Sequence, residues 1–274
     1  MVLTPALLFR TMSTVHVEQL NFKPVAMYFV AAGILYAGVF VLQGANIRAA
    51  VLALAATFGN TVMIGIPLIG LAYGQAGLVT LFTLISVHSL ILLTLTTVVL
   101  ETVRARDERA QGQSAQAPRH AVMTVLAAMK NGVIHPVPLP IILGLAFAQT
   151  GLLIPEVVDR PLQLLGSAFG PVALVLVGVT LTQVHIGPHL RDSLIFSALK
   201  NLLLPALVAT LGWLAGFDGV ALSVMTVAAS LPVGANVFMF AQRYQVAQDL
   251  VTASMTVSTV LGLLTISVVM ALVG

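Results

Sequence analysis

Two long apolar segments, one in each half of the chain, are interrupted by glycine and proline. The first interruption runs from Thr57 to Pro67, and the second runs from Ser230 to Phe238. Glycine weakens a helix, and proline removes a backbone donor and clashes with the preceding turn. Peptide groups freed at membrane depth are tolerated only where protein or a water-lined cavity satisfies them. The paired interruptions therefore predict a buried polar site formed by two broken helices near the bilayer midplane.

The composition is that of a membrane protein. Hydrophobic residues make up 59% of the chain and charged residues 8%, and the mean hydropathy is +1.05. The apolar stretches are roughly 20 residues long, the length of helix that crosses about 30 Å of hydrocarbon, whereas a transmembrane barrel would show short alternating strands. We predict an all-α polytopic protein that passes several times through the plasma membrane or cell inner membrane, with the lipid bilayer as its surroundings.

The placement of the charges and the absence of certain motifs argue against several other classes of protein. The net charge is +3, but the bases lie mostly in short loops between spans, as membrane topology requires, so we predict no nucleic-acid partner. The chain has no cysteine, which excludes disulfides and thiol chemistry. It contains no phosphate-binding loop, no pair of histidines with metal-ligand spacing and glutamate, and no nucleophile elbow. We therefore predict that it is not an enzyme and has no cofactor and no metal site.

Hydropathy along the chain predicts eight spans. They lie at about 25–43, 49–73, 78–100, 136–150, 161–184, 193–213, 219–241 and 249–273. The residues before the first span, 1–9, are too short to cross a membrane, and we interpret them as the end of a helix. Residues 101–120 are rich in arginine, glutamine, glycine and serine without an apolar face, and they predict a hydrophilic cytoplasmic loop.

The distribution of bases sets the orientation and divides the chain. With the loop inside, eight bases are cytoplasmic and two are outside, namely Arg48, Arg104, Arg106, Arg109, Arg119, Lys130, Arg191 and Arg243 against Lys23 and Arg160. The predicted units are an N-terminal repeat at 1–100, with a remnant helix and three spans, and a C-terminal repeat of five spans at 121–274. Because five is odd, tandem units of this kind have opposite orientations. By this symmetry the first repeat lacks one helix and part of another.

The two interruptions also carry a family resemblance. The segments 59–68 and 231–238, with Tyr73-Gly74 after the first and 241–244 after the second, resemble the fourth and ninth helices of the auxin efflux carrier family. Bacterial members of that family include malonate permease-like proteins. The resemblance covers essentially the whole chain. It implies ten helices in two inverted repeats of five, a substrate site where two discontinuous helices cross, and movement of one subdomain against the other. Against this pattern the chain lacks the first helix and the start of the second, so it resembles a truncated member.

Six residues at the interruptions are the predicted substrate contacts: Gly59, Asn60, Thr61, Gly234, Ala235 and Asn236. Helix N-termini created by a break present unpaired N–H groups and a positive dipole end, which favour a carboxylate. The two asparagines donate amide hydrogens without carrying charge. The alternative is that both amides only cap the broken helix ends. Pro67 and Pro232 are predicted to break the helices at the crossover rather than to contact substrate.

Two basic residues lie inside predicted spans. Lys200 is predicted to support the site or coupling, although at this depth it could instead snorkel to the surface. His88 could exchange a proton during transport, or it could only hydrogen-bond a neighbouring helix. All nine acidic residues fall in loops or at span ends. Protons, an ion held by backbone groups, and movement without a coupling ion therefore remain open.

The residues and the family resemblance together predict a secondary transporter of small organic anions, mono- or dicarboxylates such as malonate, that works by alternating access at the crossed helices. The alternative, from another class, is a membrane protein that binds or senses the ligand without transporting it, or an inactive fragment of a carrier. A small carboxylate is the expected partner, with protons as a candidate coupling ion and a homodimer left open.

Overall fold

The computed structural model describes residues 2–110, 123–127, 129–130, 137–182 and 189–273. These residues are almost entirely helical and contain no β-strand, which confirms the all-α prediction for the described part of the chain. The helices are α1 (Leu3–Met12), α2 (Phe22–Leu42), α3 (Ile47–Thr57), α4 (Ile66–Ala110), α6 (Pro138–Ala148), α7 (Glu156–Thr182), α8 (Leu190–Ala198), α9 (Leu204–Leu214), α10 (Gly219–Ser230), α11 (Asn236–Tyr244) and α12 (Gln248–Val273). A 3₁₀ turn, Val17–Gln19, precedes α2.

Within these ranges, five helical segments are long and apolar enough to cross a membrane. They are Phe22–Leu42, Thr61–Ala110, Glu156–Val179, Leu190–Leu214 and Gln248–Val273. The helices α3, α6 and α10 are apolar but shorter. The predicted spans at 49–73 and 219–241 are each divided into two helices, α3 with the start of α4 and α10 with α11, as their interruptions indicated.

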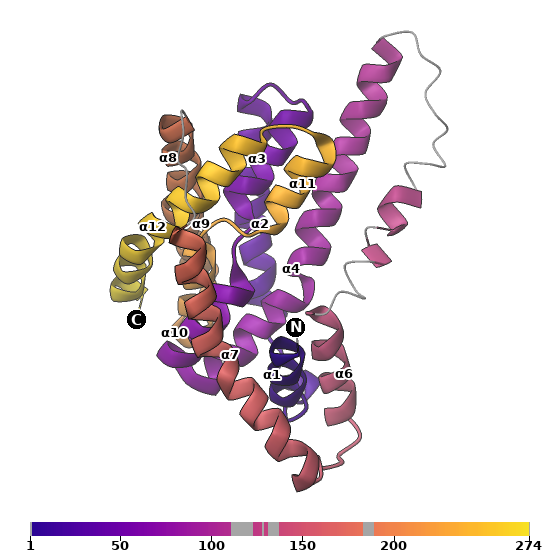
Figure 1. Ribbon diagram of the computed structural model, residues 1–274, viewed down its shortest axis with the longest axis vertical. Coiled ribbons are helices and arrows are strands. Elements are labelled where there is room, and N and C mark those ends of the chain that lie inside the picture. The colour runs from indigo at the N-terminus through magenta and orange to yellow at the C-terminus, as the bar shows by residue number, and fades with distance from the viewer. Residues whose placement is uncertain (1, 111–122, 128, 131–136, 183–188, 274) are drawn as a thin grey trace.

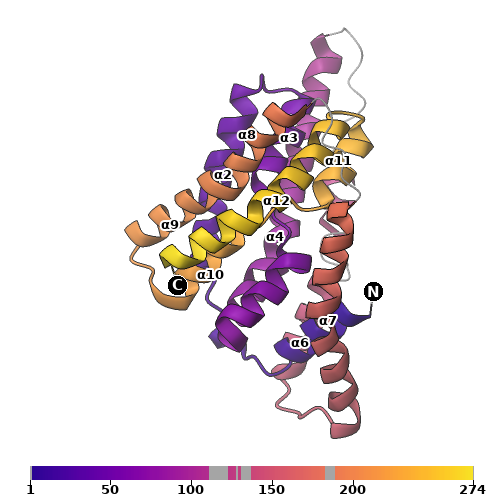
Figure 2. The same ribbon diagram turned by 60° about the vertical axis from the view of Figure 1, so that its left-hand side comes forward.

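The helices form two groups that meet along α4. In Figures 1 and 2, α1 lies beside α6 and α7, while α2, α3 and α8 to α12 gather on the other side of the molecule. An ion pair joins α1 to α7, because Arg10 donates to both carboxylate oxygens of Asp159 at 2.7 and 2.9 Å. We call α1, α6 and α7 the three-helix group, and the helices across α4 the crossover group.

The contact between α1 and α6 depends on a glycine. A Cβ atom on Gly144 would lie 2.6 Å from the carbonyl oxygen of Phe9 and 3.0 Å from the Cβ atom of Met12. The helix backbones therefore approach more closely than any other residue allows, as is common where membrane helices pack through small residues.

We expect Gly144→Ala to separate α1 from α6 and to lower the free energy of unfolding by about 1–3 kcal/mol, the usual cost of overpacking. The measurement is the thermal midpoint of the purified protein in detergent. Gly38→Ala in α2 is the matched control, because nothing lies within 4 Å of a Cβ atom at Gly38. Equal midpoints for the two variants would contradict a close contact at Gly144.

Two π-helical turns, Thr61–Gly65 and Leu199–Leu203, each precede a helix with proline as its second residue. Gly65 donates its N–H to the carbonyl of Asn60, five residues back, and Leu204 donates to Leu199 in the same way. The following Pro67 and Pro205 lack an N–H, and in a regular helix each ring would clash with the carbonyl four residues earlier. A wider turn ahead of the proline relieves this clash, and the sequence analysis did not predict it.

The predicted hydrophilic loop at 101–120 is wrong for its first half. Residues 101–110 continue α4 as a helix, whose end projects beyond the other helices in Figure 1, and residues 111–120 lie outside the described part of the chain. An ion pair of Arg104 with Glu108 at 3.1 Å, one helix turn apart, and burial of Val103 favour this helix. Arg106 also donates to the carbonyl of Ala45 at 3.2 Å.

Candidate functional site

The two interruptions cross and pair with each other. Between α3 and the first π turn the backbone of Gly59 lies antiparallel to that of Val233, which follows α10. Asn60 donates its N–H to the carbonyl of Pro232 at 2.8 Å, and Gly234 donates to the carbonyl of Phe58 at 2.9 Å. Each broken helix therefore satisfies peptide groups that the other break leaves free, which makes non-helical backbone tolerable in the interior of the protein.

Gly234 makes this close approach possible. A Cβ atom on it would lie 2.8 Å from Cδ1 of Phe58 and 3.0 Å from the carbonyl oxygen of Gly59. A Cβ atom could enter this space only if the ring of Phe58 and the carbonyl of Gly59 moved. The crossover therefore requires glycine at this position.

The two prolines have different places. Pro232 lies within the second interruption, where its carbonyl accepts the bond from Asn60. Pro67 is the second residue of α4, and the π turn Thr61–Gly65 leads into α4 without a break, so the proline follows the interruption. This corrects the prediction that Pro67 breaks the helix at the crossover, because the non-helical backbone that crosses lies at Phe58 and Gly59.

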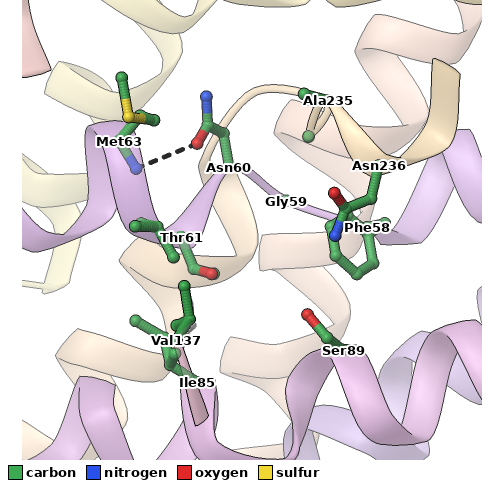
Figure 3. Close-up of a pocket in the computed structure, with 12 residues that line it drawn as sticks. Phe58, Gly59, Asn60, Thr61, Met63, Ile85, Ser89, Val137, Ala235 and Asn236 are labelled. Atoms are coloured by element: carbon green, nitrogen blue, oxygen red, sulfur yellow. Dashed lines mark hydrogen bonds between the residues drawn. The ribbon is translucent and has the colours of Figure 1, made fainter. Parts of the chain in front are cut away.

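A cavity of about 170 Å³ opens beside the crossover. Figure 3 shows the residues around it, which come from both interruptions, from the middle of α4 and from the segment just before α6. Its lining is Phe58, Gly59, Asn60, Thr61, Val62, Met63, Ile85, Ser89, Val137, Gly234, Ala235 and Asn236. All six residues predicted to contact substrate are therefore brought together around one cavity, between the crossover and the three-helix group.

The two asparagines differ in their bonding. The Oδ1 atom of Asn60 accepts a hydrogen bond from the N–H of Met63 at 3.1 Å, so this oxygen caps the π turn, while its amide nitrogen points away from Met63 in Figure 3. The Asn236 side chain makes no hydrogen bond with the described residues, although it stands at the start of α11. Helix capping therefore accounts for the oxygen of Asn60 and for no atom of Asn236, and both residues line the cavity.

The start of α11 adds backbone donors to these amides. Gly234 donates to Phe58, but the N–H groups of Ala235 and Asn236 have no acceptor among the described residues. The first N–H groups of a helix lack partners within the helix, and they form the positive end of its dipole. No residue of the described lining carries a charge. The cavity thus presents neutral hydrogen-bond donors, the chemistry that binds an anion without an ion pair.

His88 lies behind the cavity in an aromatic cluster. Its side chain is 1% exposed, its Nε2 atom lies 3.3 Å from the hydroxyl oxygen of Tyr28, and its ring centre lies 4.6 Å from that of Phe58. The alternative that His88 hydrogen-bonds a neighbouring helix is confirmed, since Tyr28 belongs to α2. A role in proton exchange stays a prediction.

Lys200 lies against Gly59 and is not part of the cavity lining. Its side chain is 0% exposed, and its Nζ atom donates to the carbonyls of Ala229 at 2.6 Å and Leu231 at 2.7 Å. The alternative that Lys200 snorkels to the membrane surface is therefore wrong. The amine instead binds the end of α10, directly beside the crossover.

Half of the lining was missed by the sequence analysis. Ile85 and Ser89 face the cavity from α4 because residues four apart share a helix face, and Val137 approaches from the other helix group. Phe58, Val62 and Met63 flank the predicted contacts. Apolar residues and one of the two serines of the long helix α4 carry no local signal, so only the three-dimensional arrangement identifies them.

Comparison with known proteins agrees with this geometry. The sequence profile of the family described as "Membrane transport protein" matches residues 1–270, which is nearly the whole chain. The chain belongs to this family, that of the auxin efflux carriers. A protein of Rhizobium meliloti (strain 1021), named "Putative malonate transporter", is 26% identical over 270 residues, or 96% of this chain and 81% of the relative.

Membership of the family agrees with the apolar helices described above. The chain is a multi-pass membrane protein and a transporter, which is not a class of enzyme. The cavity at the helix crossover lies where the resemblance to the auxin efflux carriers implies a substrate site. The contact roles of Gly59, Asn60, Thr61, Gly234, Ala235 and Asn236 stay predictions.

Proposed function

We propose that this transporter is a secondary carrier of small organic anions, mono- or dicarboxylates such as malonate, with the substrate bound in the crossover cavity. The observation that carries the proposal is the set of neutral donors at that cavity: the amides of Asn60 and Asn236 and the free N–H groups at the start of α11. A carboxylate accepts several hydrogen bonds at once, and the positive helix end favours its charge. The malonate assignment of the relative supports the same class of substrate.

We propose that the two halves of the chain are inverted repeats. The order of elements is the same in both: a long helix, a broken helix, and a second long helix. In the first half Tyr28 of the preceding helix contacts His88 of the following helix, and in the second half Asn201 donates to the carbonyl of Ser258 at 2.7 Å in the corresponding way. These paired contacts support a repeat in which each broken helix is held between two neighbours.

We propose alternating access by movement of the crossover group against the three-helix group. The cavity lies between them, with Val137 on one side and the paired interruptions on the other. Gly74, with φ 60° and ψ −148°, interrupts α4 in a conformation that few residues other than glycine adopt, and no described atom of another element lies within 4 Å of where its Cβ atom would be. Such a residue is suited to serve as a hinge between the groups.

For the coupling ion we propose protons, exchanged through the buried base His88, because the buried side chains of the described residues include no carboxylate. We propose that the carrier lies in the plasma membrane or cell inner membrane, where a proton gradient is available. We also propose a homodimer, in which two copies would meet at the apolar side chains that the three-helix group exposes on α7.

The test is uptake of radiolabelled malonate into proteoliposomes that contain the purified chain, with empty liposomes as control. We expect saturable uptake that unlabelled malonate inhibits and that an inward proton gradient accelerates. Saturable binding in detergent without uptake would favour a non-transporting binding protein instead. Uptake that rises linearly with concentration would contradict a carrier.

A further inference from the structure

The ammonium group of Lys200 is buried without an acidic partner. The buried polar side chains of the described residues are hydroxyls, one amide, His88 and Lys200, and none is a carboxylate. A lone ammonium in a protein interior is costly unless other groups replace its water. The two backbone carbonyls at 2.6 and 2.7 Å are the groups that do so here.

These carbonyls belong to the end of a broken helix. Ala229 is in the last turn of α10, and Leu231 follows its final residue, so their oxygens are at the negative end of the helix dipole. In transporters with discontinuous helices, unwound carbonyls and helix C-terminal ends coordinate a sodium ion or a proton. In this chain a side-chain amine occupies that position.

Charged groups on the neighbouring elements are too peripheral to pair with the amine. The charged residues on elements packed against the turn that carries Lys200 are exposed and near helix ends, namely Arg48 of α3, Arg191 and Asp192 of α8, and Asp249 of α12, with Asp218 before α10. The other titratable group facing the crossover is His88 of α4, which is a base. The positive charge of Lys200 is therefore not neutralised by an ion pair at the crossover.

The amine is separated from the cavity by one glycine. A Cβ atom on Gly59 would lie 3.3 Å from the Nζ atom of Lys200, and Gly59 itself lines the cavity. A charge at this position acts on an anion in the cavity through little intervening protein, where screening by water is weak. It does so without contacting the anion, which therefore stays free to leave.

We propose that Lys200 is a cation built into the crossover: its ammonium fills a monovalent-cation site formed by the carbonyls of Ala229 and Leu231, and it supplies from behind Gly59 the positive charge for a carboxylate in the cavity. Lys200 is a positioning residue, since it touches the helix break and not the substrate. The second part of this inference rests on the proposed function.

The cation site is tested without any substrate. Lys200→Ala vacates the space beside the two carbonyls, and methylammonium carries the lost group in diffusible form. We expect methylammonium chloride to raise the thermal midpoint of the Lys200→Ala protein in detergent, relative to choline chloride at the same concentration, and to leave the unsubstituted protein unchanged. Lys23→Ala, at an exposed lysine, is the matched control.

The effect on the anion is tested with Lys200→Gln, whose amide keeps hydrogen-bond donors near the carbonyls but carries no charge. We expect this variant to bind radiolabelled malonate at least ~10-fold more weakly than the unsubstituted chain, about the loss of one charge interaction. Lys23→Gln removes the same charge from an exposed position, and we expect it to bind malonate with unchanged affinity.

Three results have distinct meanings. If methylammonium affects Lys200→Ala and the unsubstituted protein equally, the cation site is overturned whatever malonate does. If Lys200→Gln binds malonate with unchanged affinity, the electrostatic role is overturned. If the unsubstituted chain binds no malonate, that substrate assignment fails, and the methylammonium measurement alone decides the cation site.

Discussion

An Asn60→Asp protein should fold like the unsubstituted chain but bind malonate at least ~100-fold more weakly. The new carboxylate keeps an oxygen that accepts the N–H of Met63, so the cap of the π turn is preserved. It loses the amide donor and adds a negative charge at the cavity, where repulsion of an anion at about 4 Å costs about 4 kcal/mol for an effective dielectric constant of 20. Binding in detergent and the thermal midpoint are the two measurements.

A second asparagine cap provides the control for this variant. Asn46 caps α3 by accepting the N–H of Ala49 at 2.8 Å, and it is exposed and away from the cavity. Asn46→Asp makes the same chemical change and should leave malonate affinity unchanged. If Asn60→Asp binds malonate as tightly as Asn46→Asp does, Asn60 does not face the substrate.

The Asn236→Ala protein should lose affinity for malonate by about 10- to 100-fold, the range for a hydrogen bond to a charged group. Its thermal midpoint should not change, because the Asn236 side chain makes no hydrogen bond with the described residues. The measurements are the same two as for Asn60→Asp.

Asn21→Ala should give the opposite pattern. Asn21 caps α2 by accepting the N–H of Lys23 at 3.1 Å, so its loss should lower stability by about 1 kcal/mol and leave binding intact. A lower midpoint with unchanged binding in Asn236→Ala would show that Asn236 has a structural role instead.

Local chemistry explains why the sequence predicted the crossover. Glycine, proline and asparagine inside apolar segments indicate an interrupted membrane helix and a polar site. Gly59, Asn60, Gly234 and Asn236 could therefore be assigned to one site before the fold was known. The position of Pro67 shows the limit of this reasoning. Its effect falls on the π turn before it, whereas the extended backbone forms where Gly59 meets Val233.

Contacts between distant segments could not be predicted from the pattern. The depth of Lys200 along its helix is compatible both with a side chain that snorkels to the membrane surface and with one buried in the protein. The hydrogen bonds to the α10 carbonyls show that the side chain is buried. Ser89 and Val137 have no unusual local sequence, and their place at the cavity depends on how α4 and α6 pack against the crossover. The charged stretch at 101–110 was predicted as a loop because it has no apolar face. A helix that extends beyond its neighbours needs no such face, so this pattern does not exclude a helix.

The central claim is that a carboxylate occupies the crossover cavity, and the absence of cysteine allows a direct test by labelling. Ser89→Cys places one thiol in the cavity lining, and Ser86→Cys places one on the same helix outside it. The measurement is the rate of alkylation by a small maleimide with and without saturating malonate. We predict that malonate slows alkylation of Ser89→Cys and leaves Ser86→Cys unaffected; equal rates for Ser89→Cys with and without malonate would contradict a substrate site at the crossover.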